Sequence, residues 1–340
     1  MKAALHDGKG TMQLKDMNRP SLEDRDVLIR VKATGICGSD LLDYSHLVTV
    51  PGGHEVAGEI VEVGSSIDVS RLGERVAIET IGQGLNCKDC WFCRQGEFIH
   101  CSNKTSNEGG GFAEYIKRRA DGCYPIGKNM NWQDGALVEP LAVSVHGIRR
   151  GRMNSGDTVV VLGSGTIGLT TVAAARALGA GKIFVTARHK HQAELAKLLG
   201  ADEALPPEGA LLKEAVLDIT GGRGADITLE TVGGNSGATI HQSFNITRHM
   251  GRIVILGCFF APVPVDFLQC HVREHNILAS ICYSVIDGKH DYEVAIDLMD
   301  SGRVNLKEMV THKFALSDIQ RGFEIASNKS SGSIKVQIHQ

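Results

Sequence analysis

The sequence predicts an α/β protein in which a doubly wound parallel sheet follows a β-rich N-terminal region. Three observations lead to this class. Strand-like apolar runs alternate with helical patterns after about residue 145, a glycine-rich turn joins the first of these strands to a helix, and short β-branched runs fill the first 140 or so residues. The chain has 340 residues, which is enough for two domains of ordinary size.

The N-terminal region is expected to consist of short strands. Residues 27–32 (VLIRVK), 55–63 (EVAGEIVEV) and 75–78 (RVAI) are rich in β-branched side chains. Gly, Asp and Ser separate these runs, and such residues favour the turns between strands. A cysteine-rich segment at about residues 84–105 follows the third run, so we expect it as an inserted lobe.

The pattern changes to alternating strands and helices near residue 145. Residues 158–162 (TVVVL) predict a buried strand, 167–178 a helix, 182–186 (KIFVT) the next strand and 191–199 the next helix. Later strands are expected at 226–229, 252–256 and 333–338, and a later helix at 292–299. This alternation is typical of βαβ units that build a parallel sheet.

Four cysteines form the strongest spacing signal of the chain, C-x2-C-x2-C-x7-C. They are Cys87, Cys90, Cys93 and Cys101. Four thiolates suit the closed tetrahedral shell of a structural zinc, which leaves no open position for chemistry. Two disulfides, or an iron–sulfur cluster, are the alternatives for such a run.

Composition excludes several classes of function. The net charge of -3 and the pI near 6.5 do not favour nucleic-acid binding. The first residues lack the apolar core of a signal peptide, and no run of about 18 apolar residues predicts a membrane span. Nine cysteines without a secretory signal are expected in a reducing, cytoplasmic setting.

A dinucleotide turn is predicted at residues 163–168, where the sequence is G-x-G-x-x-G. Gly163, Gly165 and Gly168 follow an apolar strand, and Thr166 and Ile167 open the predicted helix. In this context the glycines make the turn, admit the pyrophosphate and pack the helix on the strand. The N–H groups at the start of the helix would then bind the phosphates.

The end of the second predicted strand favours NADP over NAD. An acidic residue at this place would bind the ribose 2′-hydroxyl of NAD, but the sequence has Ala187, followed by Arg188 and Lys190. The missing carboxylate removes a repulsion of the 2′-phosphate of NADP, and Arg188 could bind that phosphate. The alternative is that these cations are a solvated helix start.

A second candidate metal centre comes from Cys37, His54 and Glu139. Cys37 lies in a glycine-flanked loop, His54 precedes a predicted strand, and Glu139 is a charge among apolar residues. A Cys, a His and a carboxylate with one open position are typical of a catalytic zinc. Spacing alone leaves a purely structural role for each residue open.

These segments together resemble the zinc-dependent medium-chain alcohol dehydrogenase superfamily, and most closely its sorbitol (polyol) dehydrogenase branch. The resemblance runs nearly from end to end, through GICGSD, GHEVAGEIVEVG, GERVAIE, the four-cysteine segment, GGFAEYI, GALVEPLAVSVHGIRR and VLGSGTIGL, in the family's order. The segment around Glu139 points to the polyol branch, because alcohol dehydrogenases proper usually carry Cys there.

The resemblance implies a GroES-like β-barrel catalytic domain at 1–145 and 285–340, and a Rossmann domain at 146–284. It implies two zinc ions per chain, a small alcohol or ketone substrate, and a homodimer or homotetramer. The catalytic zinc would be bound by Cys37 and His54, with Glu55 as a direct or alternate ligand and Glu139 at the metal directly or through water. Ser39 would relay the substrate proton while a hydride passes to the nicotinamide, and Lys335 would lie near the cofactor.

Two departures from the family affect the expected substrate and proton path. Relatives commonly have His five residues after the catalytic Cys, where this chain has Leu42, so His46 or water would complete the relay. Only 16 residues separate Cys37 from His54, and this short loop suits a larger substrate. The alternatives are an enzyme like L-threonine dehydrogenase or a sugar-phosphate dehydrogenase, or a non-catalytic nucleotide-binding protein on the same scaffold.

Overall fold

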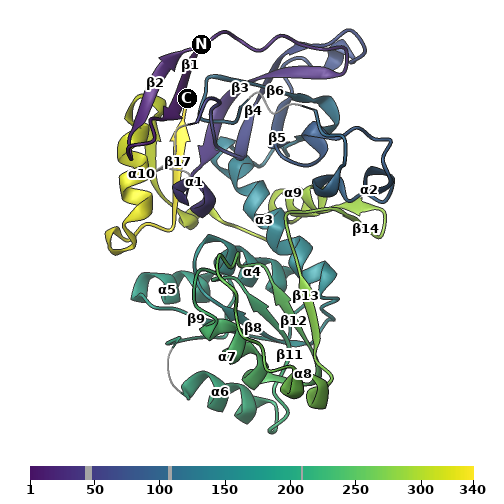
Figure 1. Cartoon of the computed structure of the whole chain (residues 1–340), viewed down its shortest axis with the longest axis vertical. Helices are drawn as coiled ribbons and strands as arrows, with labels where there is room; N and C mark the ends of the chain where they lie inside the picture. The colour runs from purple at the N-terminus through teal and green to yellow at the C-terminus, as the bar shows by residue number, and fades with distance from the viewer. Residues whose placement is uncertain (43–47, 106–108, 208–209) are drawn as a thin grey trace. The chain divides into compact units, whose positions relative to one another are not determined.

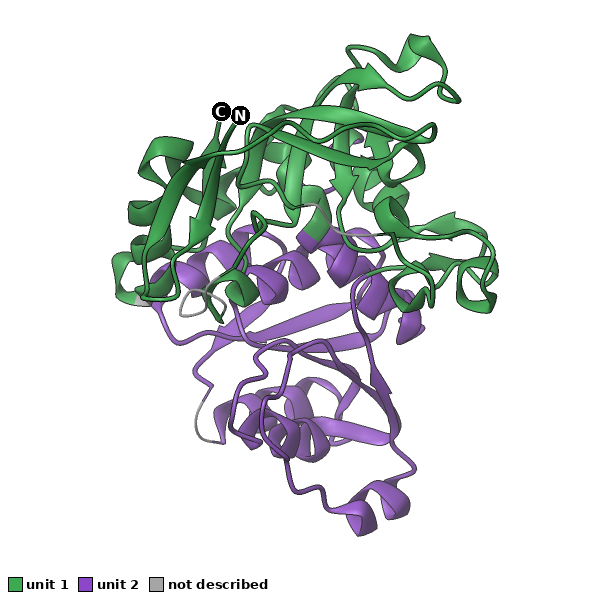
Figure 2. Ribbon diagram, turned by 45° about the horizontal axis from the view of Figure 1, so that its top comes forward, with its two compact units in different colours: residues 1–139, 283–300, 306–340 green, residues 140–282, 301–305 purple. Residues whose placement is uncertain are grey.

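The computed structural model of the chain describes residues 1–42, 48–105, 109–207 and 210–340. The chain divides into two compact units (Figure 2). Unit 1 contains Met1–Glu139, Tyr283–Asp300 and Leu306–Gln340, and unit 2 contains Pro140–Cys282 and Ser301–Asn305. The first division therefore falls at Glu139, a few residues before the expected boundary at 145, and residues 301–305 belong to the second unit.

Unit 1 is built on a seven-stranded sheet, in the order β16-β17-β3-β4-β5-β7, with β6 paired to β3 (Figure 1). Its strands are β3 (Asp26–Gly35), β4 (Glu55–Val63), β5 (Arg75–Glu79), β6 (Tyr115–Arg119), β7 (Cys123–Pro125), β16 (Val310–Ala315) and β17 (Lys335–His339). A separate hairpin joins β1 (Lys2–His6) to β2 (Met12–Asp16). Because β17 pairs with β3, the end of the chain completes a sheet begun by its first third.

The β-branched residues that predict these strands also form the core of unit 1. Val27, Ile29 and Val31 of β3 pack with Val56 and Ile60 of β4 in one buried cluster. Alternate residues of a strand point to opposite faces, so this spacing places one face of each strand in the core. The cysteine-rich lobe follows β5, as predicted, and contains η3 (Gln83–Leu85), α2 (Trp91–Arg94) and η4 (Phe98–His100).

Unit 2 contains a six-stranded parallel sheet, in the order β10-β9-β8-β11-β12-β13. The strands are β8 (Thr158–Leu162), β9 (Lys182–Thr186), β10 (Glu203–Leu205), β11 (Ala225–Glu230), β12 (Thr247–Ile255) and β13 (Asn276–Ala279). The order runs outward from β8 in one direction and from β11 in the other. In such doubly wound sheets, ligands bind beyond the carboxyl ends of the strands, where the order reverses.

Helices connect the strands of unit 2. They are α4 (Thr166–Ala177), α5 (Lys190–Leu198), α6 (Leu211–Ile219), α7 (Ala238–Ile246) and α8 (Phe267–Arg273). The remaining helices are α1 (Gly38–Leu42), α3 (Trp132–Arg150), α9 (Asp291–Asp300) and α10 (Ile319–Ser327). The short helical turns outside the lobe are η2 (Val69–Arg71), η5 (Ala120–Gly122), η6 (Lys307–Met309), η7 (Leu316–Asp318) and η8 (Lys329–Ser331), and β14 (Val285–Ile286) pairs with β15 (Lys289–His290).

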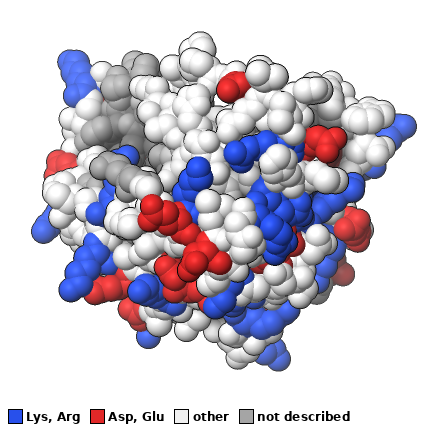
Figure 3. Space-filling view, turned by 90° about the horizontal axis from the view of Figure 1, so that it is seen from below, with Lys and Arg blue, Asp and Glu red and all other residues white. Residues whose placement is uncertain are grey.

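The helices and the charges of one face complete the description of the fold. In the part of the chain that the structure describes, no helix is both long and apolar enough to span a membrane. On the face drawn in Figure 3, Lys and Arg side chains are interspersed with Asp and Glu.

Candidate active site

Three of the predicted metal ligands come together in unit 1. Cys37 follows β3, and His54 and Glu55 stand at the start of β4, which pairs with β3. The ligand atoms of Cys37, His54 and Glu55 all lie within 4.8 Å of one another. Two adjacent strand ends therefore bring a thiol, an imidazole and a carboxylate to one point, the donor set that zinc accepts.

The carboxylate of Glu55 fits a metal ion at this point. Its Oε1 accepts a hydrogen bond of 2.6 Å from Lys335 Nζ, while its buried Oε2 has no hydrogen-bond partner in the described part of the chain. A Cβ on Gly35 would lie 1.8 Å from that Oε2, so only glycine leaves room for the carboxylate here. A buried carboxylate oxygen without a partner is costly, and a bound cation would satisfy it.

Asp40 is a functional residue that the sequence analysis did not single out. Its Oδ2 accepts a 2.8 Å hydrogen bond from Cys37 N, and its Oδ1 lies 3.6 Å from His54 Nδ1. Burial raises the pKa of Asp40, and the charge of His54 opposes this shift. A carboxylate beside the second nitrogen of a ligating imidazole fixes the orientation of the ring. The sequence GICGSD holds the signal, since Asp40 follows Cys37 by three residues.

The charges around His54 favour its protonated form in the metal-free protein. Burial lowers the pKa of His54, but a hydrogen bond with Cys37 and the charge of Asp40 raise it well above its ordinary value. A metal ion binds only the neutral imidazole, so a metal ion and a proton compete for the ring nitrogen of His54 that faces the other ligands.

Glu139 lies near the three ligands without joining their close set. It stands on α3, is buried, and interacts electrostatically with both His54 and Glu55. Burial raises the pKa of Glu139 to about 7, and the charge of His54 opposes the shift. Ligation by Glu139, directly or through water, therefore stays a prediction.

Lys335 lies beside Glu55 and Ile36, whereas its sequence motif predicts a place near the cofactor. Besides its bond to Glu55, its Nζ donates a 3.0 Å hydrogen bond to the carbonyl of Ile36. The ion pair is buried, with 2% of the Lys335 side chain and 1% of the Glu55 side chain exposed. Burial lowers the pKa of Lys335, but the charges of Glu55, Cys37 and Glu139 and the hydrogen bond to Glu55 together raise the pKa above its usual value. A cofactor contact for Lys335 has no support in these contacts.

The structure describes two of the three positions that bear on the expected proton relay, Ser39 and Leu42. Ser39 lies in α1, two residues after Cys37, and is exposed. Leu42 ends the same helix with about half of its surface exposed (51%), and it carries no group that moves a proton. His46, the other candidate for the relay, lies outside the described residues.

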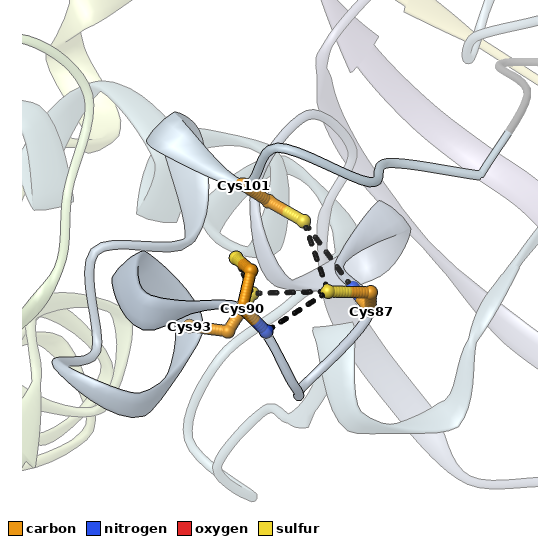
Figure 4. A group of neighbouring side chains, drawn as sticks. All are labelled: Cys87, Cys90, Cys93 and Cys101. Carbon is orange, nitrogen blue, oxygen red and sulfur yellow. Dashed lines mark hydrogen bonds between the residues drawn. The ribbon is translucent and has the colours of Figure 1, made fainter.

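The four cysteines of the lobe converge on one point (Figure 4). The Sγ atoms of Cys87 and Cys101 lie 3.5 Å apart, those of Cys90 and Cys93 also 3.5 Å, and those of Cys87 and Cys93 4.0 Å. These separations exclude disulfides, whose sulfurs are about 2.05 Å apart. They agree with the edges of a tetrahedron whose Zn–S distances are about 2.3 Å.

The electrostatics of the lobe favours thiolates. Backbone N–H groups of Cys93 and Ser102 lower the pKa of Cys90 to about 6. The N–H of Cys90 likewise lowers the pKa of Cys87. Burial opposes this at Cys93, where it raises the pKa to about 12. Metal binding would compensate for that cost, because the thiolate is the ligand form.

The dinucleotide turn has the expected geometry. Gly163 adopts φ +104°, a left-handed conformation, and a Cβ there would meet Val232 Cγ2 at 2.7 Å. A Cβ on Gly168 would lie 2.1 Å from the Gly163 carbonyl oxygen, whereas one on Gly165 would meet open space. Thus the first glycine makes the turn, the last allows close packing, and the middle one leaves the approach free for a phosphate.

The end of β9 adjoins this turn. Thr186, which the sequence analysis did not single out, accepts a 2.8 Å hydrogen bond from Gly163 N through its Oγ1. Ala187 and Arg188 follow, and the Arg188 side chain is exposed with no ion pair among the described residues. Lys190, in contrast, pairs with Glu194 at 3.7 Å. Arg188 is therefore the cation available to a ligand.

A dinucleotide turn in unit 2 and a Cys–His–Glu set in unit 1 define a metal-using dehydrogenase. Comparison with known proteins agrees with this class. The model of the alcohol dehydrogenase GroES-like domain matches residues 23–128, and that of the zinc-binding dehydrogenases matches residues 166–301. The chain belongs to the zinc-dependent medium-chain alcohol dehydrogenase superfamily, in its polyol branch.

Individual relatives are similar over nearly their whole length. The sorbitol dehydrogenase of Bacillus subtilis is 32% identical, over 100% of this chain and 97% of the relative. The L-idonate 5-dehydrogenase of Vitis vinifera is 31% identical, over 98% and 93%. A putative zinc-binding dehydrogenase of Sinorhizobium meliloti, solved bound to NADP, superposes with a TM-score of 0.86 at 27% identity, over 100% and 99%.

These findings confirm the predicted fold and the class of reaction. Unit 1 contains the GroES-like domain and unit 2 the parallel Rossmann sheet. The chain is an NAD(P)-dependent alcohol or polyol dehydrogenase of a zinc-dependent family.

Proposed function

We propose that this chain oxidises a secondary hydroxyl group of a polyol to a ketone at a catalytic zinc site made by Cys37, His54 and Glu55. The observation that carries this proposal is the Glu55 carboxylate: one of its oxygens lies within 4.8 Å of a thiol and an imidazole, and its buried Oε2 has no hydrogen-bond partner among the described residues. A bound zinc would supply a Lewis acid that lowers the pKa of the substrate hydroxyl, and a bound nicotinamide would supply the hydride acceptor. Glu139 contacts the metal through water.

The surrounding side chains orient these ligands and move the proton. Asp40 holds the His54 ring, and Lys335 holds one oxygen of Glu55 so that the other faces the metal. Ser39 Oγ would relay the proton of the substrate hydroxyl, accepting it while its own hydroxyl proton passes to solvent, since Ser39 is exposed two residues from Cys37. The thiolate and the carboxylate together balance the charge of Zn²⁺, and the cysteine lobe binds a second, structural zinc.

The substrate is a polyol or a related sugar derivative. Relatives named sorbitol dehydrogenase, D-xylulose reductase and L-idonate 5-dehydrogenase support this class. The test is a panel of sorbitol, xylitol, secondary alcohols, L-threonine and sugar phosphates, run with NAD and NADP side by side. Preference for a phosphorylated sugar or for L-threonine would reject the polyol proposal, and zinc-loaded protein that oxidises none would indicate a non-catalytic protein.

We infer a preference for NADP from the end of β9. Residues 186–193 contain no carboxylate, and Arg188 is exposed without an ion pair among the described residues. A carboxylate at this place would bind the ribose diol and repel a phosphate, whereas a guanidinium binds a phosphate through two parallel hydrogen bonds.

Replacing Arg188 with Ala is expected to weaken NADP selectively. A hydrogen bond to a charged group contributes about 1.5–3 kcal/mol, so kcat/KM for NADP should fall about 10–100-fold while that for NAD changes less than about twofold. Lys190→Ala is the matched control and should have little effect, because Glu194 already pairs with Lys190. A wild-type preference for NAD, or an equal loss for both cofactors, would contradict the inference.

We propose that the chain forms a homodimer through strand β13. Among the described residues this strand pairs only with β12, so its other edge is open. Exposed apolar side chains surround it on α8, on β13 and just after it: Phe267, Leu268, Val272, Ile277 and Ile281. The strand Asn-Ile-Leu-Ala carries neither the charge nor the proline that protects an open edge. A second copy, related by a twofold axis, would pair with this edge in antiparallel register.

Replacing Ile277 with Lys is expected to convert the dimer into a monomer. The added charge would be buried at the centre of the paired edges, and the molar mass measured by sedimentation or light scattering should halve. Leu198→Lys is the control, since Leu198 is also exposed in unit 2 (69%) but lies on α5. A monomeric wild-type protein, or an Ile277→Lys variant with unchanged mass, would reject this interface; a mass of four chains would add a second contact.

A further inference from the structure

Glu230 is a buried carboxylate that the proposed chemistry does not use. It ends β11, and its residue is 0% exposed. Its Oε1 accepts three hydrogen bonds, from Val232 N at 2.9 Å, Gly233 N at 3.0 Å and Thr239 Oγ1 at 2.8 Å. Its Oε2 has no hydrogen-bond partner, and no cation pairs with the carboxylate in the described ranges.

The burial of the Glu230 carboxylate lowers the stability of the fold, so we expect this group to have a structural or functional role. A buried carboxylate without a cation has lost its water and regains only part of that energy from hydrogen bonds. Here three donors meet on one oxygen, and two of them are consecutive backbone N–H groups of the loop after β11. The carboxylate therefore holds the backbone at Val232 and Gly233, in the middle of residues 231–234.

That loop contacts the dinucleotide turn directly. Thr231 donates hydrogen bonds from both N and Oγ1 to the carbonyl of Leu162, the last residue of β8, at 3.0 and 2.7 Å. A Cβ on Gly163 would meet Val232 Cγ2 at 2.7 Å. Even so, Val232 remains 48% exposed, so an apolar side chain stands open beside the turn.

The same carboxylate also adjoins the loop after β12. Gly257 N donates to the Glu230 carbonyl at 3.1 Å, and a Cβ on Gly257 would lie 2.4 Å from Glu230 Oε2. Gly234 N in turn donates to the Cys258 carbonyl at 2.7 Å. Glu230 thus lies where the loops after β11 and β12 pack on each other, next to the turn after β8.

These three strand ends mark the place where the sheet order reverses. The half of the sheet that contains β8, β9 and β10 presents Ala187 and Arg188 to the adenosine part of the cofactor, as inferred above. The other half, with β11 and β12, is left for the nicotinamide part, since the dinucleotide lies across the two halves.

We propose that Glu230 is a positioning residue for the nicotinamide half of the cofactor site. It holds residues 231–234 so that Val232 faces the nicotinamide mononucleotide, and it does not touch the adenosine half. The inference rests on the cofactor site proposed above. It would make Glu230 important for NADPH and NADH alike, because the two differ only at the adenosine ribose.

The test compares a whole cofactor with its adenosine half on the full-length, zinc-loaded protein. Dissociation constants are measured by calorimetry for NADPH, NADH and adenosine 2′,5′-bisphosphate. Glu230→Ala should weaken both dinucleotides about tenfold or more and change the bisphosphate less than about twofold. Glu230→Gln, which keeps a side-chain oxygen for the same N–H groups, should restore most of the affinity.

Two further variants separate positioning from general stability. Thr228→Val is the matched control, because Thr228 lies on the same strand, is buried, and forms a 2.7 Å hydrogen bond with Thr247 Oγ1. Loss of this hydrogen bond should lower the melting temperature without changing the dissociation constants of the dinucleotides or of the bisphosphate. Thr239→Val removes one donor to Glu230 and should weaken the dinucleotides about threefold even if Glu230→Ala does not fold. An equal loss of dinucleotide and bisphosphate affinity, or no loss in any variant, would overturn the proposal. Wild-type protein that binds no dinucleotide would instead reject the cofactor site itself.

Discussion

Replacing Cys37 with Ala is expected to lower polyol turnover at least about 10³-fold. The thiolate is one of three groups whose ligand atoms lie within 4.8 Å of one another, and two ligands hold zinc poorly. Polarisation by a metal contributes several kcal/mol to such a reaction, and each 1.36 kcal/mol is a factor of ten in rate. Rates are measured with the preferred polyol at saturating cofactor, and His54→Ala should have the same effect.

Measurements of metal content and of cofactor binding test whether the loss of turnover comes from the catalytic site alone. The variant should lose one of two zinc ions by elemental mass spectrometry and keep the ion of the cysteine lobe. Its dissociation constant for NADPH should stay within about twofold, since the dinucleotide turn belongs to the other unit. Cys123→Ala is the matched control, because Cys123 is a buried cysteine of the same unit outside both metal sites. Undiminished turnover, or two zinc ions in Cys37→Ala, would reject the catalytic site.

The elements that the sequence predicts well are those with a strong local pattern. The runs at 55–63, 158–162 and 182–186 coincide with β4, β8 and β9. The runs at 158–162 and 182–186 are almost continuous in apolar or β-branched residues, and the run at 55–63 mixes such residues with Glu, so neighbouring residues indicate each strand. The glycine turn after β8 is equally local, and its geometry agrees with the pattern.

Helix α3 and strand β13 are not predicted, for physical reasons. Pro140 stands inside α3 and removes a backbone donor, which normally ends a helix. Here the helix continues through it, and side chains of Ser144 and Thr170 donate to the Pro140 carbonyl. Strand β13 has only four residues, and only its pairing with β12 makes it a strand.

The proposed metal centre shows more clearly what a local sequence pattern cannot predict. Cys37 and His54 can be recognised from motifs, but the role of Lys335 depends on a contact with Glu55 across 280 residues of sequence. No local pattern encodes that contact. It arises because β17 completes the sheet beside β3, so the end of the chain lies against the loop that carries Cys37.

Replacing Lys335 with Met is expected to destabilise the protein without zinc at Glu55 by about 3–5 kcal/mol, because it leaves a buried carboxylate without any cation. The free energy of unfolding is measured by urea titration. The double variant Glu55→Gln/Lys335→Met should be less destabilised than Lys335→Met alone, because the carboxylate charge that needs the lysine is gone. The single variant Glu55→Gln should be destabilised, because it leaves the buried ammonium group of Lys335 without its carboxylate. Lys335→Arg, which keeps the charge, is the matched control.

An additive double variant would show that Glu55 and Lys335 do not depend on each other. A large rise in the NADPH dissociation constant with little loss of stability would instead return Lys335 to the cofactor site, against its two hydrogen bonds to Glu55 and Ile36.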